Sequence, residues 1–178
     1  PFHARASALS RTYVYLVGAP PPAALAPYAW SLPDPVAFPG VAPRLDPSRV
    51  RAALSAARGT FDFAGLARGG ARGDATRTLL RAEVIAARVA PLVAIVIEGR
   101  GFLRAMVRNL VGASVTAGLG AAPTSIVGDL LASRSRYRGV RAPGWGLTLA
   151  AVSYPTGTLP WDAPPPRTEG SHRIPLLG

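Results

Sequence analysis

The 178-residue sequence contains no cysteine, no lysine and only two histidines. Without cysteine the chain can form no disulfide and no cysteine-ligated zinc or iron–sulfur site, and two histidines leave little for another metal centre. The longest apolar stretch, residues 84–97, is interrupted by Arg88 and Pro91 and is too short to span a membrane. The sequence therefore predicts neither a metal cofactor nor a membrane segment.

Negative charge is also scarce, because nine acidic residues stand against twenty arginines and give a formal net charge of +11. This excess fits a polyanionic partner, since the arginine guanidinium binds phosphate through a planar fork and stacks on bases. The choice of arginine over lysine is less informative, because abundant Ala, Pro and Gly indicate the codon usage of a GC-rich genome. A hydrophobic content of 49% predicts one globular domain with a core.

The residue pattern predicts strands and helices in alternation along the chain. Runs rich in β-branched and aromatic residues predict four strands, of which the middle two form a hairpin around Pro91: 11–17, 78–89, 92–98 and 147–154. Helical spacing and capping residues predict three helices: 47–58, 101–117 and 123–133. The first of these helices has the clearest limits, with Asp46 as N-cap and Gly59 as the stop.

These elements indicate an α+β fold, in which a mostly antiparallel sheet carries helices packed on one face. A proline-rich connection reaches Arg44, and further loops are expected over 61–75 and over the basic segment 134–141. The folded domain is predicted to cover 1–155, and 156–178 to form a proline-rich tail.

The predicted helix over 101–117 carries arginines beside an apolar stripe. The apolar residues recur in pairs at helical spacing: Phe102–Leu103, Met106–Val107 and Leu110–Val111. They should face a core, whereas Arg104 and Arg108 would lie four residues apart on another side of the helix. Such a pattern is equally typical of a helix with a solvated polar face.

The identities of the residues in several segments are more specific than the spacing of their apolar positions. In chain order they read Phe2-His3-Ala4-Arg5-Ala6-Ser7-Ala8, Arg11-Thr12-Tyr13-Val14-Tyr15, Gly59-Thr60-Phe61-Asp62-Phe63, Arg77-Thr78-Leu79, Gly101-Phe102-Leu103-Arg104-Ala105-Met106-Val107-Arg108-Asn109-Leu110-Val111-Gly112 and Ala142-Pro143-Gly144-Trp145-Gly146-Leu147. In wording and order they resemble the TruA family, the tRNA pseudouridine synthases that act on the anticodon arm. The resemblance covers about residues 2–155.

The resemblance implies an enzyme that isomerises uridine to pseudouridine in tRNA without a cofactor. It also implies a homodimer and an eight-stranded sheet, of which this chain would supply about half. The family's catalytic aspartate lies in a Gly-Arg-Thr-Asp segment upstream of the first matching block, and none of the nine acids here stands in such a setting. We therefore expect a C-terminal portion of a longer protein, inactive by itself, with the aspartate supplied upstream.

Three residues would contribute to the site of such an enzyme. The resemblance makes Tyr13 the residue that stacks on the flipped base, Arg108 the partner of the catalytic aspartate and Leu147 an apolar wall of the base pocket. Without the resemblance, Tyr13 and Leu147 would equally be core residues of strands. Because burying an unpaired charge is costly, we expect Arg108 near the surface or facing a cleft.

Basic residues are the candidates for contacts with the RNA backbone, through phosphate rather than catalysis. They are His3, Arg5, Arg11, Arg104, Arg134, Arg136, Arg138 and Arg141. The last four belong to a basic loop, which could also be merely solvated. The family usually has an Asp-Arg pair where this chain has Arg134–Ser135, an arginine where it has Val14, and a histidine before Asp62.

These departures leave a second interpretation open, a catalytically inactive RNA-binding or ribosome-associated paralogue that would bind tRNA or ribosomal RNA. A general basic interaction domain is a third interpretation, which the ordered motifs disfavour. The protein would work in the cytoplasm if it is bacterial, and in a mitochondrion or plastid if it is organellar.

Overall fold

The computed structural model of the protein describes residues 2–18, 20–32, 34, 36–40, 44–69, 73–88, 91–133 and 136–157. Its strands are β1 (Ser10–Gly18), β2 (Trp30–Ser31), β3 (Gly59–Asp62), β4 (Thr76–Ala86), β5 (Leu92–Gly99) and β6 (Leu147–Ser153). Its helices are α1 (Pro47–Ser55), α2 (Met106–Gly118) and α3 (Ile126–Ser133), with short 3₁₀ turns η1 (Ala23–Tyr28) and η2 (Ala64–Leu66). No helix within these ranges is long and apolar enough to cross a bilayer.

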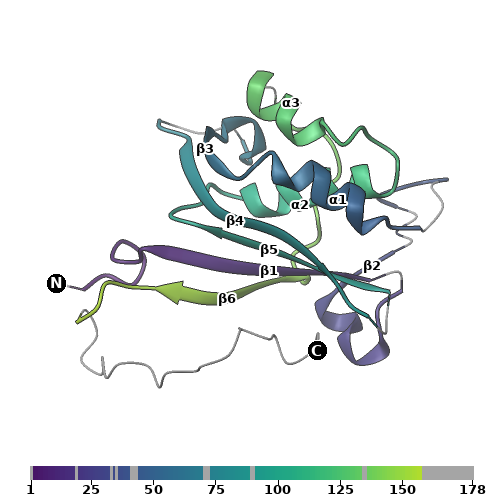
Figure 1. Cartoon of the computed structure of the whole chain (residues 1–178), viewed down its shortest axis with the longest axis horizontal. Helices are drawn as coiled ribbons and strands as arrows, with labels where there is room; N and C mark the ends of the chain where they lie inside the picture. The colour runs from purple at the N-terminus through teal and green to yellow at the C-terminus, as the bar shows by residue number, and fades with distance from the viewer. Residues whose placement is uncertain are drawn as a thin grey trace.

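The strands form one sheet in the order β2-β1-β5-β4-β3, and β6 pairs with β1. All pairings are antiparallel except the two-residue pairing of β1 with β2. The helices α1, α2 and α3 lie on one face of the sheet (Figure 1). The predicted α+β class, the β4–β5 hairpin and the placement of the helices on one face are confirmed.

The core lies between this face of the sheet and the helices. Tyr15 of β1 and Ile95 of β5 are register partners that point into it, where they join Leu54 of α1 and Leu110 of α2. Helix α2 is buried almost all round, which is expected of a helix packed between a sheet and other helices. Burial of each large apolar side chain contributes about 1.5–3 kcal/mol. The burial of α2 therefore fixes the position of each of its ends.

Helix α1 begins as predicted but ends three residues early. The carboxylate of Asp46 accepts hydrogen bonds from the backbone N–H groups of Ser48 and Arg49, at 2.8 and 3.4 Å. At the other end Ala57 and Arg58 close a tighter turn, and Gly59 begins β3 with a φ of +124°. That conformation favours glycine, so Gly59 does mark the break in the chain, although it comes four residues after Ser55, the last residue of the helix.

The predicted helix over 101–117 is wrong in its first five residues. Ala105 has a φ of +62° and lies in the left-handed region, so the helix can start only at Met106. Consequently Arg104 precedes the helix, and the expected four-residue spacing with Arg108 on one helix face does not exist. The buried stripe of Met106, Val107, Leu110 and Val111 is confirmed.

Smaller elements also differ from the prediction. The proline-rich connection contains η1 and β2, and the expected loop over 61–75 begins with the end of β3 and contains η2. Helix α3 starts at Ile126 instead of near Pro123. The predicted tail over 156–178 lies outside the described residues except for Thr156 and Gly157.

Candidate active site

A cavity of about 370 Å³ opens at the N-terminal end of α2. Its walls come from β1, from the segment that leads into α2, from the first turn of α2 and from the chain around the start of β6. The lining residues are Tyr13, Arg68, Phe102, Leu103, Arg104, Ala105, Met106, Val107, Arg108, Arg141 and Leu147. The three residues predicted to carry the site, Tyr13, Arg108 and Leu147, thus meet in one cavity although they are far apart in the sequence.

Arg108 occupies the first turn of α2 and is half-buried on the cavity wall, as expected of an arginine without an acidic neighbour. Its Nε donates a hydrogen bond of 2.6 Å to the carbonyl of Ala142. No hydrogen bond to its two terminal nitrogens is found within the described residues. The side chain is therefore held by one backbone contact while the outer edge of its guanidinium fork stays available to an anion.

The backbone around Ala142 separates Arg108 from the buried tyrosine Tyr15. The Tyr15 hydroxyl donates a hydrogen bond of 2.8 Å to the carbonyl of Pro143. Burial raises the pKa of Tyr15 far above its usual value, and the charge of Arg108 offsets this only in part. Tyr15 therefore stays neutral and serves as a fixed support for the Arg108 wall.

Tyr13 points to the same side of β1 as Tyr15, two residues away, but lies at the rim of the core instead of inside it. It is half-buried, and its ring meets Phe102 edge-on with centroids 5.1 Å apart and an interplanar angle of 88°. Such a T-shaped contact leaves an aromatic surface fixed in orientation beside the cavity. An aromatic ring at this position can stack on a planar base.

The loop before β6 is held against α2 by a close approach at Gly112. A Cβ at Gly112 would lie 1.9 Å from the carbonyl oxygen of Val140, so no larger residue fits there. Buried Asn109 fixes the same region, because its amide donates to the carbonyl of Leu66 at 2.7 Å and accepts from Nε of Arg141 at 3.1 Å. These contacts set the position of Arg141. They also set the position of Leu147, which follows Arg141 in the same connection and begins β6.

Four arginines line the cavity, Arg68, Arg104, Arg108 and Arg141, and no acidic residue from the described part of the chain does. The cavity also lies at the positive end of the α2 dipole, where no side chain caps the helix. Its charge is therefore suited to an anion such as phosphate or a carboxylate. Within the described residues no group of three His, Cys, Asp or Glu side chains could hold a metal ion.

The other predicted RNA-binding residues fall into three groups. Arg5 and Arg11 line a neighbouring cavity and not this one. His3 is exposed and its Nδ1 accepts the backbone N–H groups of Arg5 and Ala6, so the ring shapes its own turn. Three residues of the basic loop remain: Arg136 and Arg138 are exposed outside both cavities, and Arg134 lies outside the described residues.

Sequence reasoning missed three contributors to this cavity. Arg68 comes from a glycine-rich segment without a recognisable motif, and its backbone N–H reaches the carbonyl of Arg104 at 2.8 Å. Phe102 was assigned to the stripe of a helix that begins only after it. Asn109 stood inside the quoted motif, and a polar residue between Val107 and Leu110 of a core-facing helix was a signal for a buried hydrogen bond.

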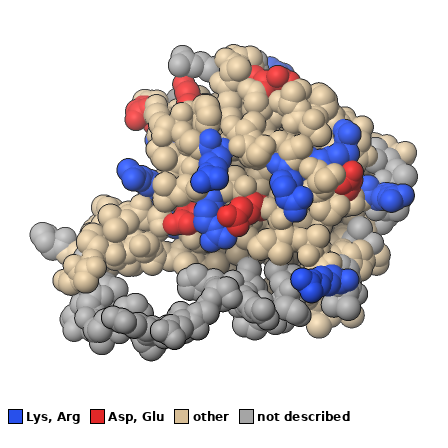
Figure 2. Space-filling view, in the orientation of Figure 1, with Lys and Arg blue, Asp and Glu red and all other residues tan. Residues whose placement is uncertain are grey.

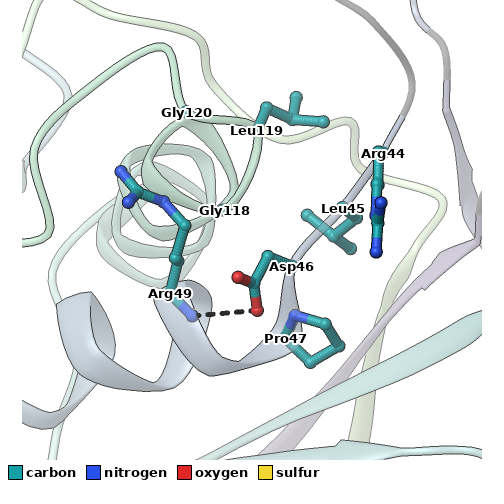
Figure 3. Close-up of a pocket in the computed structure, with 8 residues that line it drawn as sticks. All are labelled: Arg44, Leu45, Asp46, Pro47, Arg49, Gly118, Leu119 and Gly120. Atoms are coloured by element: carbon teal, nitrogen blue, oxygen red, sulfur yellow. Dashed lines mark hydrogen bonds between the residues drawn. The ribbon is translucent and has the colours of Figure 1, made fainter.

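A second hollow, of about 590 Å³, lies at the opposite end of α2, between that end and the start of α1 (Figure 3). It is larger, but two of its three charged residues, Asp46 and Arg49, serve the helix ends. Asp46 caps α1, and Arg49 donates to the carbonyls of Ala117 and Ala122 at 2.8 and 3.3 Å. Size therefore does not identify the site here, and the chemistry of the lining residues does.

The overall charge does not locate the site either. Figure 2 shows arginine and acidic side chains next to one another in the middle of the face that is viewed. Within the described residues one ion pair occurs, between Arg81 and Glu83 at 2.7 Å, and both side chains are largely exposed. The arginines of the cavity at the start of α2 differ from this pair, because no acidic partner lies beside them among the described residues.

Comparison with known proteins gives the family of the chain. Residues 53–155 match the family described as tRNA pseudouridine synthase. Proteins named tRNA pseudouridine synthase A are similar over most of the chain: that of Chloroflexus aurantiacus is 35% identical over 97% of the chain and 61% of its own length. That of Roseiflexus sp. is 38% identical over 92% and 59%, and that of Chlamydia trachomatis 35% identical over 86% and 55%.

The chain thus spans about three fifths of the length of these relatives. The family match covers more than half of the chain and includes α2, the loop after it and β6, which supply most of the cavity walls. The resemblance to the TruA family is confirmed, and the chain belongs to the tRNA pseudouridine synthase family.

Proposed function

We propose that this chain forms one wall of the active site of a tRNA pseudouridine synthase that converts uridine to pseudouridine in the anticodon arm. The observation that carries the proposal is the meeting of Tyr13, Arg108 and Leu147 in one arginine-lined, acid-free cavity. Tyr13 and Leu147 lie on the paired strands β1 and β6, and Arg108 joins them in the cavity from α2.

The reaction breaks the bond between N1 of the uracil ring and C1′ of the ribose, turns the base and joins C5 to C1′. The proton that leaves C5 is replaced by one on N1, so the product is an isomer and no cofactor is consumed. A base inside an RNA helix is inaccessible to such chemistry, so the nucleotide must first leave its stack. The site consequently needs an aromatic surface, a water-poor wall and cations for the backbone.

In this proposal Tyr13 stacks on the displaced base and Leu147 covers it on the apolar side. Arg104, Arg141 and Arg68 bind the phosphates that flank the nucleotide. The carboxylate that the chemistry requires comes from a segment upstream of this chain, and the terminal nitrogens of Arg108 bind it. An arginine in hydrogen-bond contact with a carboxyl group lowers the pKa of that group and keeps it ionised at neutral pH. The chain by itself is then inactive.

The test uses the full-length protein that carries this chain and tRNA labelled with tritium at C5 of its uridines. Release of tritium to water is expected with the parent protein and is expected to be lost with Tyr13→Ala. Tyr28→Ala is the matched control, because Tyr28 is 62% exposed on η1 and lines neither this cavity nor its neighbour. It should release tritium at the parent rate.

The assay separates the enzyme from the binding protein of the same fold. Tight binding of tRNA and of ribosomal RNA without release from any uridine, by a protein with an intact melting transition, would favour an inactive RNA-binding paralogue. Equal release from Tyr13→Ala and the parent protein would leave the reaction standing and remove Tyr13 from the site.

A further inference from the structure

The neighbouring cavity that Arg5 and Arg11 line has a volume of about 420 Å³, lies beside the candidate active site and shares two residues with it. It is lined by Arg5, Arg11, Tyr13, Arg77, Gly101 and Phe102, and we call it the arginine cavity. The edge-on pair of Tyr13 and Phe102 forms the partition between the two cavities. The two sites are therefore neighbours on one surface, separated by the width of an aromatic contact.

Three arginines from separate parts of the chain converge on the arginine cavity. Arg11 extends from β1, and its Nη2 donates to the backbone carbonyl of Arg5. Arg77 extends from β4, and its Nη1 donates to the carbonyls of Thr76 and Asp74, at 2.6 and 3.2 Å. Gly101 lies beside the Arg77 side chain, and a Cβ there would meet it at 3.4 Å, in ordinary van der Waals contact.

None of these three charges is held in an ion pair within the described residues, where the ion pair found joins Arg81 to Glu83 elsewhere on β4. Every acceptor of Arg11 and Arg77 named above is a neutral backbone carbonyl. Hydrogen bonds from Thr76, and more weakly the charge of Arg77, hold the pKa of the Asp74 carboxyl below its usual value, but this carboxylate does not line the cavity. Three like charges with one weak counter-charge repel one another, so this arrangement costs stability unless an anion is bound.

We propose that the arginine cavity binds a phosphodiester of the RNA strand, next to the nucleotide that enters the candidate active site. This inference rests on the proposed function and adds a position on the substrate to it. When a nucleotide turns out of a helix, its base moves but the phosphates on either side remain attached to it. When the base lies against Tyr13 in one cavity, the RNA backbone crosses the Tyr13–Phe102 partition. A phosphate that flanks the nucleotide then lies in the arginine cavity, within reach of Arg11 and Arg77.

The chemistry of the lining fits a phosphodiester better than a base. Arginine forks match the geometry of phosphate oxygens and bind them through paired, charge-assisted hydrogen bonds. Among the described residues, the aromatic side chains of the cavity are the two that form the partition, so a base would have no second surface to stack on. Arg77, which has no role in the proposed chemistry, thereby becomes a substrate-positioning residue.

The first experiment measures the affinity of the full-length protein for an unmodified tRNA transcript at several salt concentrations. Arg77→Met is expected to weaken binding about tenfold and to reduce the slope of log K against log salt by about one, since one phosphate contact is lost. Arg77→Lys should recover part of the affinity and most of the slope. Arg81→Met is the matched control on the same strand, because Arg81 is already paired with Glu83.

The second experiment locates the phosphate by a double-substitution cycle. Anticodon stem–loop oligonucleotides each carry one uncharged methylphosphonate, at successive positions around the loop. At one position the parent protein should lose about tenfold in affinity while Arg77→Met loses clearly less, because the two changes remove a shared contact and only the contact of Arg11 is left to lose. Arg11→Met should give the same position, which guards against a folding defect peculiar to one variant.

Additive losses at every position, with an unchanged salt slope, would overturn the proposal. So would binding of inorganic phosphate to the parent protein that Arg77→Met abolishes while no RNA position is coupled, because the cavity would then serve a free phosphate ester. Tritium release tells the two proposals apart. Release without coupling rejects the phosphate site alone, whereas coupling without release rejects the synthase reaction and retains the site.

Discussion

The two ends of α2 hold arginines in opposite settings. At the C-terminal end Arg49 donates to the carbonyls of Ala117 and Ala122, next to the hollow of Figure 3. A cation there satisfies the last carbonyls of the helix and is stabilised by its dipole. At the N-terminal end Arg104 and Arg108 lie at the positive pole of the same dipole, without an acidic residue among the cavity lining.

This difference separates charges that hold the fold together from charges that can bind a ligand. The arginine at the C-terminal end donates two hydrogen bonds to carbonyls of the protein, and its charge complements the negative pole of the helix. The arginines at the N-terminal end are placed where the helix itself disfavours them, and only a bound anion would compensate. One buried helix therefore serves as a structural support at one end and as the base of a site at the other.

The largest effect is expected when Arg108, at one end of α2, is replaced by an uncharged side chain of similar length. The same replacement of Arg49, at the other end, is the comparison. In the full-length protein, Arg108→Met should lower the rate of tritium release at least about 100-fold, because it removes a charge that holds the reacting carboxylate. Arg49→Met should release tritium at a rate within about twofold of the parent rate and should lower the free energy of unfolding by about 1 kcal/mol.

Both rates are measured at saturating tRNA, with melting curves taken on the same samples. A fall in affinity for tRNA with an unchanged maximal rate would move Arg108 from the carboxylate to the RNA backbone. Equal effects of Arg108→Met and Arg49→Met on the rate would erase the distinction between the two ends of the helix.

Two glycines extend the comparison to packing. Ala normally stabilises a helix by about 1 kcal/mol relative to Gly. At Gly112 a Cβ would collide with the backbone carbonyl of Val140 at 1.9 Å, whereas at Gly118 the nearest atoms belong to the side chains of Val50 and Leu45, at 2.4 and 2.8 Å. We expect Gly112→Ala to cost about 2–3 kcal/mol and Gly118→Ala about 1 kcal/mol.

The two glycine variants should differ in function as well as in stability. The Val140 loop carries Arg141 into the candidate active site, so Gly112→Ala should also weaken tRNA binding, measured well below its melting temperature. Gly118→Ala should bind tRNA like the parent protein. If Gly112→Ala binds tRNA normally although it is destabilised, the loop does not position the site.

The architecture was largely predictable from the sequence, because it depends on patterns that are local. Alternation in β1, the turn at Pro91 and the Asp46 cap each specify an element by themselves, and the face of α2 toward the core follows from the spacing of Met106, Val107, Leu110 and Val111. The start of α2 was not predictable in this way. Gly101–Leu103 continue the helical period, and only the left-handed backbone at Ala105 excludes them from the helix.

The candidate site was predictable only where the wording of the sequence resembled a known family. Tyr13, Arg108 and Leu147 were named on that basis, and the structure brings them into one cavity, while their roles remain proposals. The roles proposed for Arg68 and Arg77 could not be assigned from the sequence. These roles depend on which charged side chains lie near them in space. Such information comes from long-range packing.

A smaller effect is expected from Asn109, which connects α2 to both segments that frame the site. Asn109→Ala would leave the buried carbonyl of Leu66 without its donor and would release Nε of Arg141. We expect a loss of about 1–2 kcal/mol in the free energy of unfolding, measured by urea denaturation, and a weaker affinity for tRNA. Ser114→Ala is the control, since its buried hydroxyl bonds only within α2, to the carbonyl of Leu110 at 2.9 Å. It should leave tRNA binding unchanged, and a matching loss of affinity there would remove Asn109 from a positioning role.

The smallest effect concerns the carboxylate at the structural end of the comparison. Hydrogen bonds from the side chain and backbone of Ser48 hold the pKa of Asp46 below its usual value. Because the folded protein binds this proton less readily than the unfolded chain, the stabilisation is complete above the unfolded pKa and is lost as the pH falls through the folded pKa.

Asparagine caps a helix about as well as aspartate but does not titrate there. Asp46→Asn should therefore match the parent protein in melting temperature at very acidic pH, and the parent should gain a small advantage as the pH rises through the normal range of aspartate. A difference between the two melting temperatures that does not change with pH would show that the cap acts through its geometry and not through its charge.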